Sequence, residues 1–168
     1  MALNASILNQ GFLDLFSRAG SRDYPRDPKE SADRFASTYA RYARTALAGP
    51  NRPIFSGAEE AKLSSILFPA MIAPRSGTPR NLARAWQSGI ASFWLTPPIV
   101  FSGANPGVVT TIPGISSVTP CLIAVFSNRD NSSREAARGL TRCLDAVTKT
   151  IIYFSAVPPP SGFTVTLT

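Results

Sequence analysis

The chain has 168 residues, of which 44% are hydrophobic and 16% are charged. A chain of this length folds as one domain and buries about 70% of the surface that it exposes when unfolded. It is too apolar for wholesale disorder and less charged than the roughly 25% of a typical globular protein, so we expect a subunit that hides surface against neighbours. It contains no histidine, which excludes the most common general base and metal ligand.

The 17 basic residues outnumber the 10 acidic ones, which gives a formal net charge of +7 and a pI of about 10.1. Only Lys29, Lys62 and Lys149 are lysines, so the excess consists of arginine. Guanidinium groups bind carboxylates and phosphates in a bidentate manner. Between Glu60 and Asp130 the chain contains no carboxylate. The charge pattern therefore predicts anionic partners, either protein or nucleic acid.

The first 20 residues have apolar side chains at helical spacing, among them Leu3, Ile7, Phe12 and Phe16. Residues 21–28 follow with alternating charges and no apolar period, which is typical of a linker. The sequence thus predicts residues 1–20 as a detachable amphipathic arm. No basic region precedes these apolar residues, and no segment has the length of a membrane span. We expect a protein made in the cytoplasm, with no membrane contact and with thiols that are reduced at synthesis.

The next helix is predicted from a capping pattern in which Asp27 is the cap and Pro28 and Glu30 occupy the first turn. Its apolar face extends to Leu47, before Gly49 and Pro50 end it. Three arginines point away from that face, at positions Arg34, Arg41 and Arg44. Two interpretations remain open for them, a solvated helix surface and a contact face for an anionic partner.

Two further helices are predicted in the middle of the chain. Ser56 and Glu59 form a capping box before a helix that Pro69 kinks or stops, and Pro79 opens the other. The second helix has an aromatic face that ends at the Thr96-Pro97-Pro98 break and consists of Trp86, Phe93 and Trp94. We expect this face in the core or in a subunit interface, with Gly89 allowing another helix to approach closely.

The C-terminal half mixes helix and strand signals. Residues 99–114 predict a loop with a short hairpin that serves as a contact surface, and residues 121–126 predict a helix begun at Pro120. A capping box at Ser132 and Glu135 opens the last helix, and residues 150–154 switch to strand composition. Beyond the prolines at 158–160, the alternating tail consists of Phe163, Val165 and Leu167, and we expect it to extend a neighbour's sheet.

These elements predict a mainly α fold, a helical bundle with a small β element and an extended C-terminal tail. The predicted organisation is an arm at 1–20, a helical core domain at 27–157 and the tail at 158–168.

Residues that could perform chemistry do not form a recognisable motif. The sequence lacks a Walker A loop, a dinucleotide-binding glycine pattern, HExxH and GxSxG. Asp145 follows Arg138 and Arg142 on one helix and precedes Lys149, which favours a local ion-pair network over catalysis. Cys121 and Cys143 are interpreted as small buried hydrophobic residues, with a disulfide between them or across subunits as the alternative. We therefore expect no catalytic residue, no metal, no cofactor and no small-molecule substrate.

Four segments together resemble small virion structural proteins of tailed bacteriophages, over about residues 30 to 155. They are residues 34–40 (RFASTYA), 93–98 (FWLTPP), 108–111 (VVTT) and 140–151 (LTRCLDAVTKTI). The resemblance implies a subunit of a head-tail connector, tail or baseplate, made in the host cytoplasm and located in the virion. It also implies a symmetric homo-oligomer that contacts other virion proteins.

The sequence analysis therefore predicts a non-enzymatic assembly subunit that uses its arm, loop and tail for contacts. The residues predicted to lie at interfaces are Leu3, Ile7, Phe12, Phe16, Arg34, Arg41, Arg44, Trp94, Phe163, Val165 and Leu167. The alternative is a nucleic-acid-binding module that contacts DNA through an arginine-rich helix face, because the high pI satisfies the usual electrostatic criterion.

Overall fold

The computed structural model describes residues 3–17, 27–72, 79–103, 106–128, 130–155 and 164–167. The helices are α1 (Ala5–Ser17), α2 (Pro28–Ala43), α3 (Ala58–Ile72), α4 (Pro79–Leu95), α5 (Val118–Ser127) and α6 (Ser133–Thr148). The strands are β1 (Arg52–Ile54), β2 (Val100–Ser102), β3 (Gly107–Thr111), β4 (Ile152–Ser155) and β5 (Thr164–Thr166), and a 3-10 turn, η1 (Pro113–Ser117), precedes α5. The prediction of a mainly α bundle with a small β element is confirmed.

The helices begin where the capping patterns predict. The Asp27 carboxylate accepts a hydrogen bond from the Lys29 amide at 2.7 Å. Ser132 and Glu135 form a complete capping box at the start of α6. At the start of α3, the Glu59 carboxylate accepts hydrogen bonds from the Ser56 and Gly57 amides at 3.1 and 3.0 Å. These side chains satisfy amide groups that the first helical turn leaves without a partner.

Two helix ends differ from the expectation. α2 ends at Ala43 rather than at Leu47, because Thr45 Oγ1 donates a hydrogen bond to the Tyr42 carbonyl at 2.7 Å and the chain turns there. α3 continues through Pro69 as far as Ile72. Pro69 removes a backbone donor only in the last turn of this helix, where the helix is close to its end.

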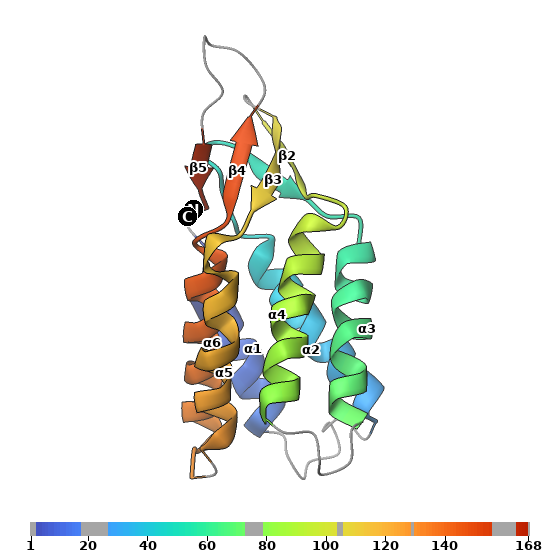
Figure 1. Cartoon of the computed structure of the whole chain (residues 1–168), viewed down its shortest axis with the longest axis vertical. Helices are drawn as coiled ribbons and strands as arrows, with labels where there is room; N and C mark the ends of the chain where they lie inside the picture. The colour runs from blue at the N-terminus through green and yellow to red at the C-terminus, as the bar shows by residue number, and fades with distance from the viewer. Residues whose placement is uncertain are drawn as a thin grey trace.

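The six helices of the described chain form a closed ring. Each helix packs against the next one in sequence, and α6 closes the ring against α1. Because the helices alternate in direction, every second connection lies at the same end of the bundle (Figure 1). The strands belong to these connections and to the segment after α6, so they gather at that end as one sheet.

The sheet is antiparallel and has the strand order β1-β2-β3-β4-β5. Successive side chains of a strand point to opposite faces of a sheet. On the face toward the helices, Phe101, Val109 and Tyr153 are buried. A register irregularity between Val109 and Thr111 interrupts the pairing of β3 with β4. The sheet therefore covers one end of the helical core with one face and leaves the other face exposed.

Aromatic side chains fill the centre of the ring. Trp86 of α4 is fully buried, and its ring lies 6.2 Å from that of Phe12 and 6.1 Å from those of Phe35 and Tyr39. The Trp94 indole donates a hydrogen bond to the Tyr39 hydroxyl at 2.9 Å. Burial raises the pKa of Tyr39 to about 12. The sequence predicted the aromatic face of α4 in the core or in an interface. Because Trp86, Phe93 and Trp94 are fully buried within the chain, the face belongs to the core.

Two glycines allow close helix packing. A Cβ atom on Gly89 of α4 would lie 2.5 Å from Leu63 Cδ1 of α3, which confirms the predicted close approach of another helix. Gly11 of α1 has the same role, because a Cβ atom there would lie 2.4 Å from Thr38 Cγ2 of α2. Gly11 lowers the intrinsic stability of the helix, yet it brings α1 against α2.

The N-terminal segment is not a detachable arm. α1 packs between α2 and α6, and its residues Leu8 and Phe12 are fully buried. The prediction of a separate arm was wrong because the apolar face of α1 is covered by the chain's own helices. Of the predicted linker 21–28, residues 21–26 lie outside the described residues, while Asp27 and Pro28 form the cap and the first residue of α2.

The C-terminal tail is not an addition to a neighbour's sheet. β5 pairs with β4 of the same chain, with Val165 opposite Tyr153. The Leu167 amide donates a hydrogen bond to the Ile151 carbonyl at 3.2 Å, and the Leu167 side chain is 2% exposed. The tail thus completes the chain's own sheet, and its apolar end belongs to the core.

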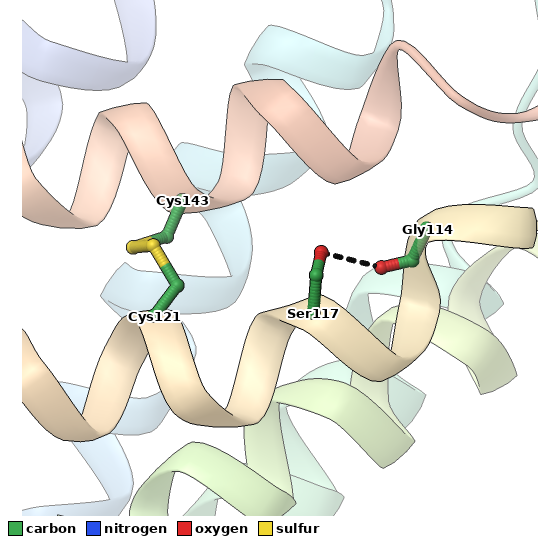
Figure 2. The surroundings of a disulfide bond; sticks show 4 residues. All are labelled: Gly114, Ser117, Cys121 and Cys143. Atoms are coloured by element: carbon green, nitrogen blue, oxygen red, sulfur yellow. Dashed lines mark hydrogen bonds between the residues drawn. A yellow bond between two sulfur atoms is a disulfide. The ribbon is translucent and has the colours of Figure 1, made fainter.

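The two cysteines form a disulfide between α5 and α6 (Figure 2). The Cα atoms of Cys121 and Cys143 are 5.8 Å apart, within the range that a disulfide spans. The interpretation of these residues as unpaired buried hydrophobic groups was therefore wrong. Their 22-residue separation in sequence hides the contact, because two helices at that distance have no fixed register until they pack.

The Glu59 cap predicts a dependence of stability on pH. Burial alone would raise the pKa of Glu59, but its backbone hydrogen bonds and the Ser56 hydroxyl outweigh this effect and lower it below 4.5. The carboxylate therefore stabilises the fold above about pH 4.5, and this contribution is lost as the pH falls through the folded pKa. We expect Glu59→Gln to lower the urea midpoint at pH 7, and the difference from the unmodified protein to shrink below pH 4.5. A difference that grows in acid would contradict this assignment.

Candidate interaction surface

The outer face of the sheet contains a row of four apolar side chains. The register pairs Ile54 with Val100, Val100 with Val108, and Val108 with Phe154. These side chains are 55%, 46%, 38% and 40% exposed, in chain order. We call Ile54, Val100, Val108 and Phe154 the outer row. It crosses four neighbouring strands at the end of the bundle (Figure 1).

Clustering distinguishes the outer row from ordinary exposed apolar residues, which are normally scattered over a protein surface. Among the described residues, five large hydrophobic side chains are exposed, and four of them form the row. The fifth, Ile72, lies at the last residue of α3, at the opposite end of the bundle (Figure 1). A contiguous apolar surface of this kind is typical of an interaction site.

The surroundings of the outer row contain little charge. The five strands contain no carboxylate, and Arg52 of β1 is their single charged residue. Arg52 is exposed and lies two positions before Ile54, so it shares the outer face. A partner of this face needs an apolar surface and few charges of its own.

The structure corrects four of the predicted interface residues. Leu3, Phe12, Trp94 and Leu167 are 6%, 0%, 0% and 2% exposed within the chain itself. They cannot anchor a neighbour because the chain's own core already surrounds them.

The other apolar candidates have different positions. Ile7 and Phe16 are partly buried and pack against the core. Val165 has a register position in β5, and Phe163 lies outside the described residues.

The predicted arginine face of α2 has partners within the chain. Arg34 pairs with Glu30 at 2.6 Å, and Arg44 lies 3.5 Å from the carboxylate of Glu60 on α3. Arg41 is exposed and borders a groove between α1 and α2 of about 240 Å³, together with Asp14. The three arginines therefore do not form one uniform stripe of unneutralised charge.

Two further carboxylates, those of Asp33 and Asp145, have structural contacts. Asp33 accepts hydrogen bonds from Lys29 and Ser64, which lower its pKa. The Asp145 carboxylate accepts a hydrogen bond from the Tyr42 hydroxyl at 2.7 Å and pairs with Lys149 at 2.8 Å. The expected network around Asp145 is thus present through Lys149. Within the described ranges, no three of the His, Cys, Asp and Glu side chains form a group that could hold a metal ion.

Two grooves flank α6. The groove against α5 has a volume of about 410 Å³, and the groove against α1 has a volume of about 390 Å³. Arg138 and Arg142 border both grooves. Asn9 and Thr141 also line the groove against α1. The Oδ1 atom of Asn9 and the Oγ1 atom of Thr141 are buried and have no hydrogen-bond partner.

The unpartnered Thr141 hydroxyl predicts a stabilising substitution. Replacing a buried hydroxyl that forms no hydrogen bond with a methyl group of similar size removes a desolvation cost of about 1 kcal/mol. We expect Thr141→Val to raise the free energy of unfolding by about 1 kcal/mol, or the melting temperature by about 2 to 4 °C. Thr148→Val is the matched control, because Thr148 Oγ1 donates to the Leu144 carbonyl at 2.7 Å and contacts the Tyr39 hydroxyl at 2.9 Å. Thermal melts should move in opposite directions, and a loss of stability in Thr141→Val would refute the assignment.

None of the helices in the described part of the chain combines the length and the apolar character that crossing a membrane requires.

Sequence reasoning missed the outer row, although the apolar residues of 99–114 gave a partial signal. Val100 and Val108 lie within residues 99–114, the segment that the sequence predicts as a contact surface. That contact role stays a prediction.

Comparisons with protein-family models, with curated proteins and with solved structures find no match to this chain.

Proposed function

We propose that the chain is a non-enzymatic assembly subunit that contacts a second copy of itself through the outer row. The observation that supports this function is the register of Ile54, Val100, Val108 and Phe154 on one exposed face. The structural contacts of the carboxylates, in caps and ion pairs, also support a structural role over a catalytic one.

The size of the outer row favours a repeated weak contact over a stable isolated dimer. Full burial of one such side chain stabilises by about 1.5 to 3 kcal/mol, so the eight half-exposed side chains of two facing rows contribute roughly 6 to 12 kcal/mol. Association costs about 4 to 15 kcal/mol in lost rotational and translational freedom. A single contact is therefore marginal, and several such contacts in a symmetric particle would reinforce one another.

A second copy fits the row because the row is self-complementary about a two-fold axis. A two-fold axis that lies in the plane of the interface, parallel to the strands and midway between Val100 and Val108, places Ile54 of one copy against Phe154 of the other. Arg52, on the edge strand β1, then faces β4 of the second copy, which contains no charged residue. Like charges are thereby kept apart, which an interface between identical chains requires.

The particle that we propose is the virion of a tailed bacteriophage. The resemblance of residues 34–40, 93–98, 108–111 and 140–151 supports this, and it implies a head-tail connector, tail or baseplate with other virion proteins as further neighbours. The location in the virion is part of the same proposal.

Charge substitutions at the two ends of the row test the proposal. Ile54→Lys with Phe154→Lys places the new charges on β1 and β4, which are not neighbours within the chain. Across the two-fold axis the same charges meet, so we expect self-association to be lost in sedimentation velocity at protein concentrations where the unmodified chain associates. Ile54→Lys with Phe154→Glu should restore association, because opposite charges then meet.

Ile72→Lys is the matched control, since Ile72 is a comparably exposed apolar residue at the other end of the bundle. It should associate like the unmodified chain. Loss of association in all three variants, or in none, would overturn the proposed contact. Failure of the Lys–Glu variant to recover, with Ile72→Lys associating normally, would exclude the two-fold arrangement in which Ile54 meets Phe154. Mass spectrometry of purified particles tests the virion assignment separately.

A further inference from the structure

We propose that the exposed side of α6 binds the phosphate backbone of a nucleic acid through Arg134, Arg138 and Arg142. We call these three residues the α6 ridge. This inference goes beyond the assembly function, does not depend on it, and uses a different surface of the molecule.

The spacing of the α6 ridge places its guanidinium groups along one side of the helix. The residues are four apart, which corresponds to a rise of about 6 Å between successive side chains. All three are exposed. Among the described residues, none of the three has a carboxylate within 4.0 Å. Their hydrogen-bond donors are therefore available to a ligand.

The acidic groups on α6 are already engaged. Glu135 accepts hydrogen bonds from the Ser132 amide and hydroxyl in the capping box, at 2.8 and 2.6 Å. Asp145 is held by Tyr42 and by Lys149. Asp130 is exposed and precedes the helix near Arg134. Arg138 helps to lower the pKa of Glu135 through its charge, but it forms no ion pair within 4.0 Å with a described carboxylate.

The neighbouring helices do not neutralise the ridge. α5 contains no charged residue, and the single charged residue of α1 is Asp14. Asp14 accepts a hydrogen bond from Gln10 at 2.8 Å and borders neither of the two grooves beside α6. The ridge thus forms a line of positive charge between two largely uncharged helices.

The ridge is better suited to phosphates than to an acidic protein. Protein interfaces depend on buried aromatic or large aliphatic anchors at their centre. In the described ranges, none of the exposed large hydrophobic side chains lies on α1, α5 or α6. Recognition on this side has to rest on charge and hydrogen bonds, and the arginine fork matches phosphate oxygens.

The ridge is also held rigidly. The capping box fixes the first turn of α6, and the disulfide joins its Cys143 to α5 (Figure 2). Arg138 and Arg142 border a groove on each side, so phosphate oxygens can approach their guanidinium groups from both flanks. Because the helix backbone is already fixed, only the arginine side chains lose conformational entropy when a ligand binds.

Fluorescence anisotropy with a labelled duplex DNA of about 20 base pairs tests this inference, with salt varied from about 50 to 200 mM. Each phosphate contact contributes about 0.9 to the salt slope, so three contacts weaken binding about 40-fold over that range. We expect Arg134→Gln, Arg138→Gln and Arg142→Gln together to reduce the slope by about 2.7, and Arg138→Gln alone by about 0.9.

The matched control replaces Arg34 and Arg41 of α2 and Arg44 at its C-terminal cap with Gln, which changes the net charge by the same amount. The control should retain the salt slope of the unmodified chain. An equal loss in both triple variants would mean nonspecific attraction by net charge and would overturn the proposal. Absence of DNA binding at 50 mM salt would also overturn the proposal. If poly-glutamate displaced the labelled DNA as well as unlabelled DNA does, the ridge would be assigned to an acidic protein instead.

Discussion

Trp86→Ala is expected to lower the free energy of unfolding by about 3 to 5 kcal/mol, as large aromatic truncations in protein cores do. Trp86 is fully buried, and its ring contacts Phe12 of α1 and both Phe35 and Tyr39 of α2. The substitution leaves a cavity in the centre of the helix ring, where neighbouring helices cannot all move inward. Several aromatic contacts are therefore lost together.

Urea unfolding followed by far-UV circular dichroism measures the loss. Trp86→Phe keeps an aromatic ring in the cavity and should cost less than half as much as Trp86→Ala, which keeps the test meaningful if the alanine variant does not fold. Val108→Ala is the surface control, since Val108 is 38% exposed, and it should change stability by less than about 1 kcal/mol. A loss below about 1.5 kcal/mol for Trp86→Ala would place Trp86 outside the cooperative core.

The helices were predictable because their ends are defined by local chemistry. The capping residues Asp27, Ser56 and Ser132 act on amides within the next three positions, so the pattern can be recognised without knowing the rest of the fold. The Thr96-Pro97-Pro98 break likewise ends α4 at Leu95, as predicted. Elements specified by neighbouring residues are the ones that sequence reasoning recovered.

The errors at the two termini have a common physical cause. The apolar periodicity of α1 shows that one face is buried, but it does not show which surface covers it. Phe12 packs against Phe35 and Trp86, which are distant in sequence. Val165 finds its register opposite Tyr153 in the same way. Both termini therefore matched the pattern of an arm or tail while belonging to the core.

The candidate surface could not be predicted because it depends on register between short strands. Ile54 and Phe154 lie on strands that are each separated from the neighbouring β2 and β3 by two α-helices. β1 and β2 have three residues each, too few for a visible alternation. A shift of one residue in any pairing would move its side chain to the buried face, so the outer row exists only in the folded register.

The α6 arginines illustrate a different limit. Their spacing was visible in the sequence, where Arg138 and Arg142 were assigned to an ion-pair network with Asp145. In the structure Asp145 is held by Tyr42 of α2 and by Lys149 instead. Tyr42, 103 residues away in sequence, is a partner of Asp145 that the spacing along one helix does not reveal.

Replacing both Cys121 and Cys143 with Ser is expected to lower the free energy of unfolding by about 3 kcal/mol. The disulfide closes a segment whose ends are 22 residues apart, and in the chain-entropy description a loop of this length restricts the unfolded state by about that amount. The closed loop contains the turn between α5 and α6, so its loss also frees the two helices from each other in the unfolded chain.

Reduction of the unmodified protein provides the internal comparison. With excess dithiothreitol, its urea midpoint should fall to that of the double Ser variant, while the variant should not respond to the reductant. The single variant Cys143→Ser should match the double variant, because one serine is enough to remove the bond. Equal midpoints with and without reductant in the unmodified protein would show that the disulfide does not stabilise the fold.

If removal of the disulfide lowers stability but leaves the salt slope for DNA unchanged, the capping box and helix packing alone hold the α6 ridge in place. If the free energy of unfolding and the salt slope for DNA both fall, α6 needs its covalent link to α5 to present the three arginines together.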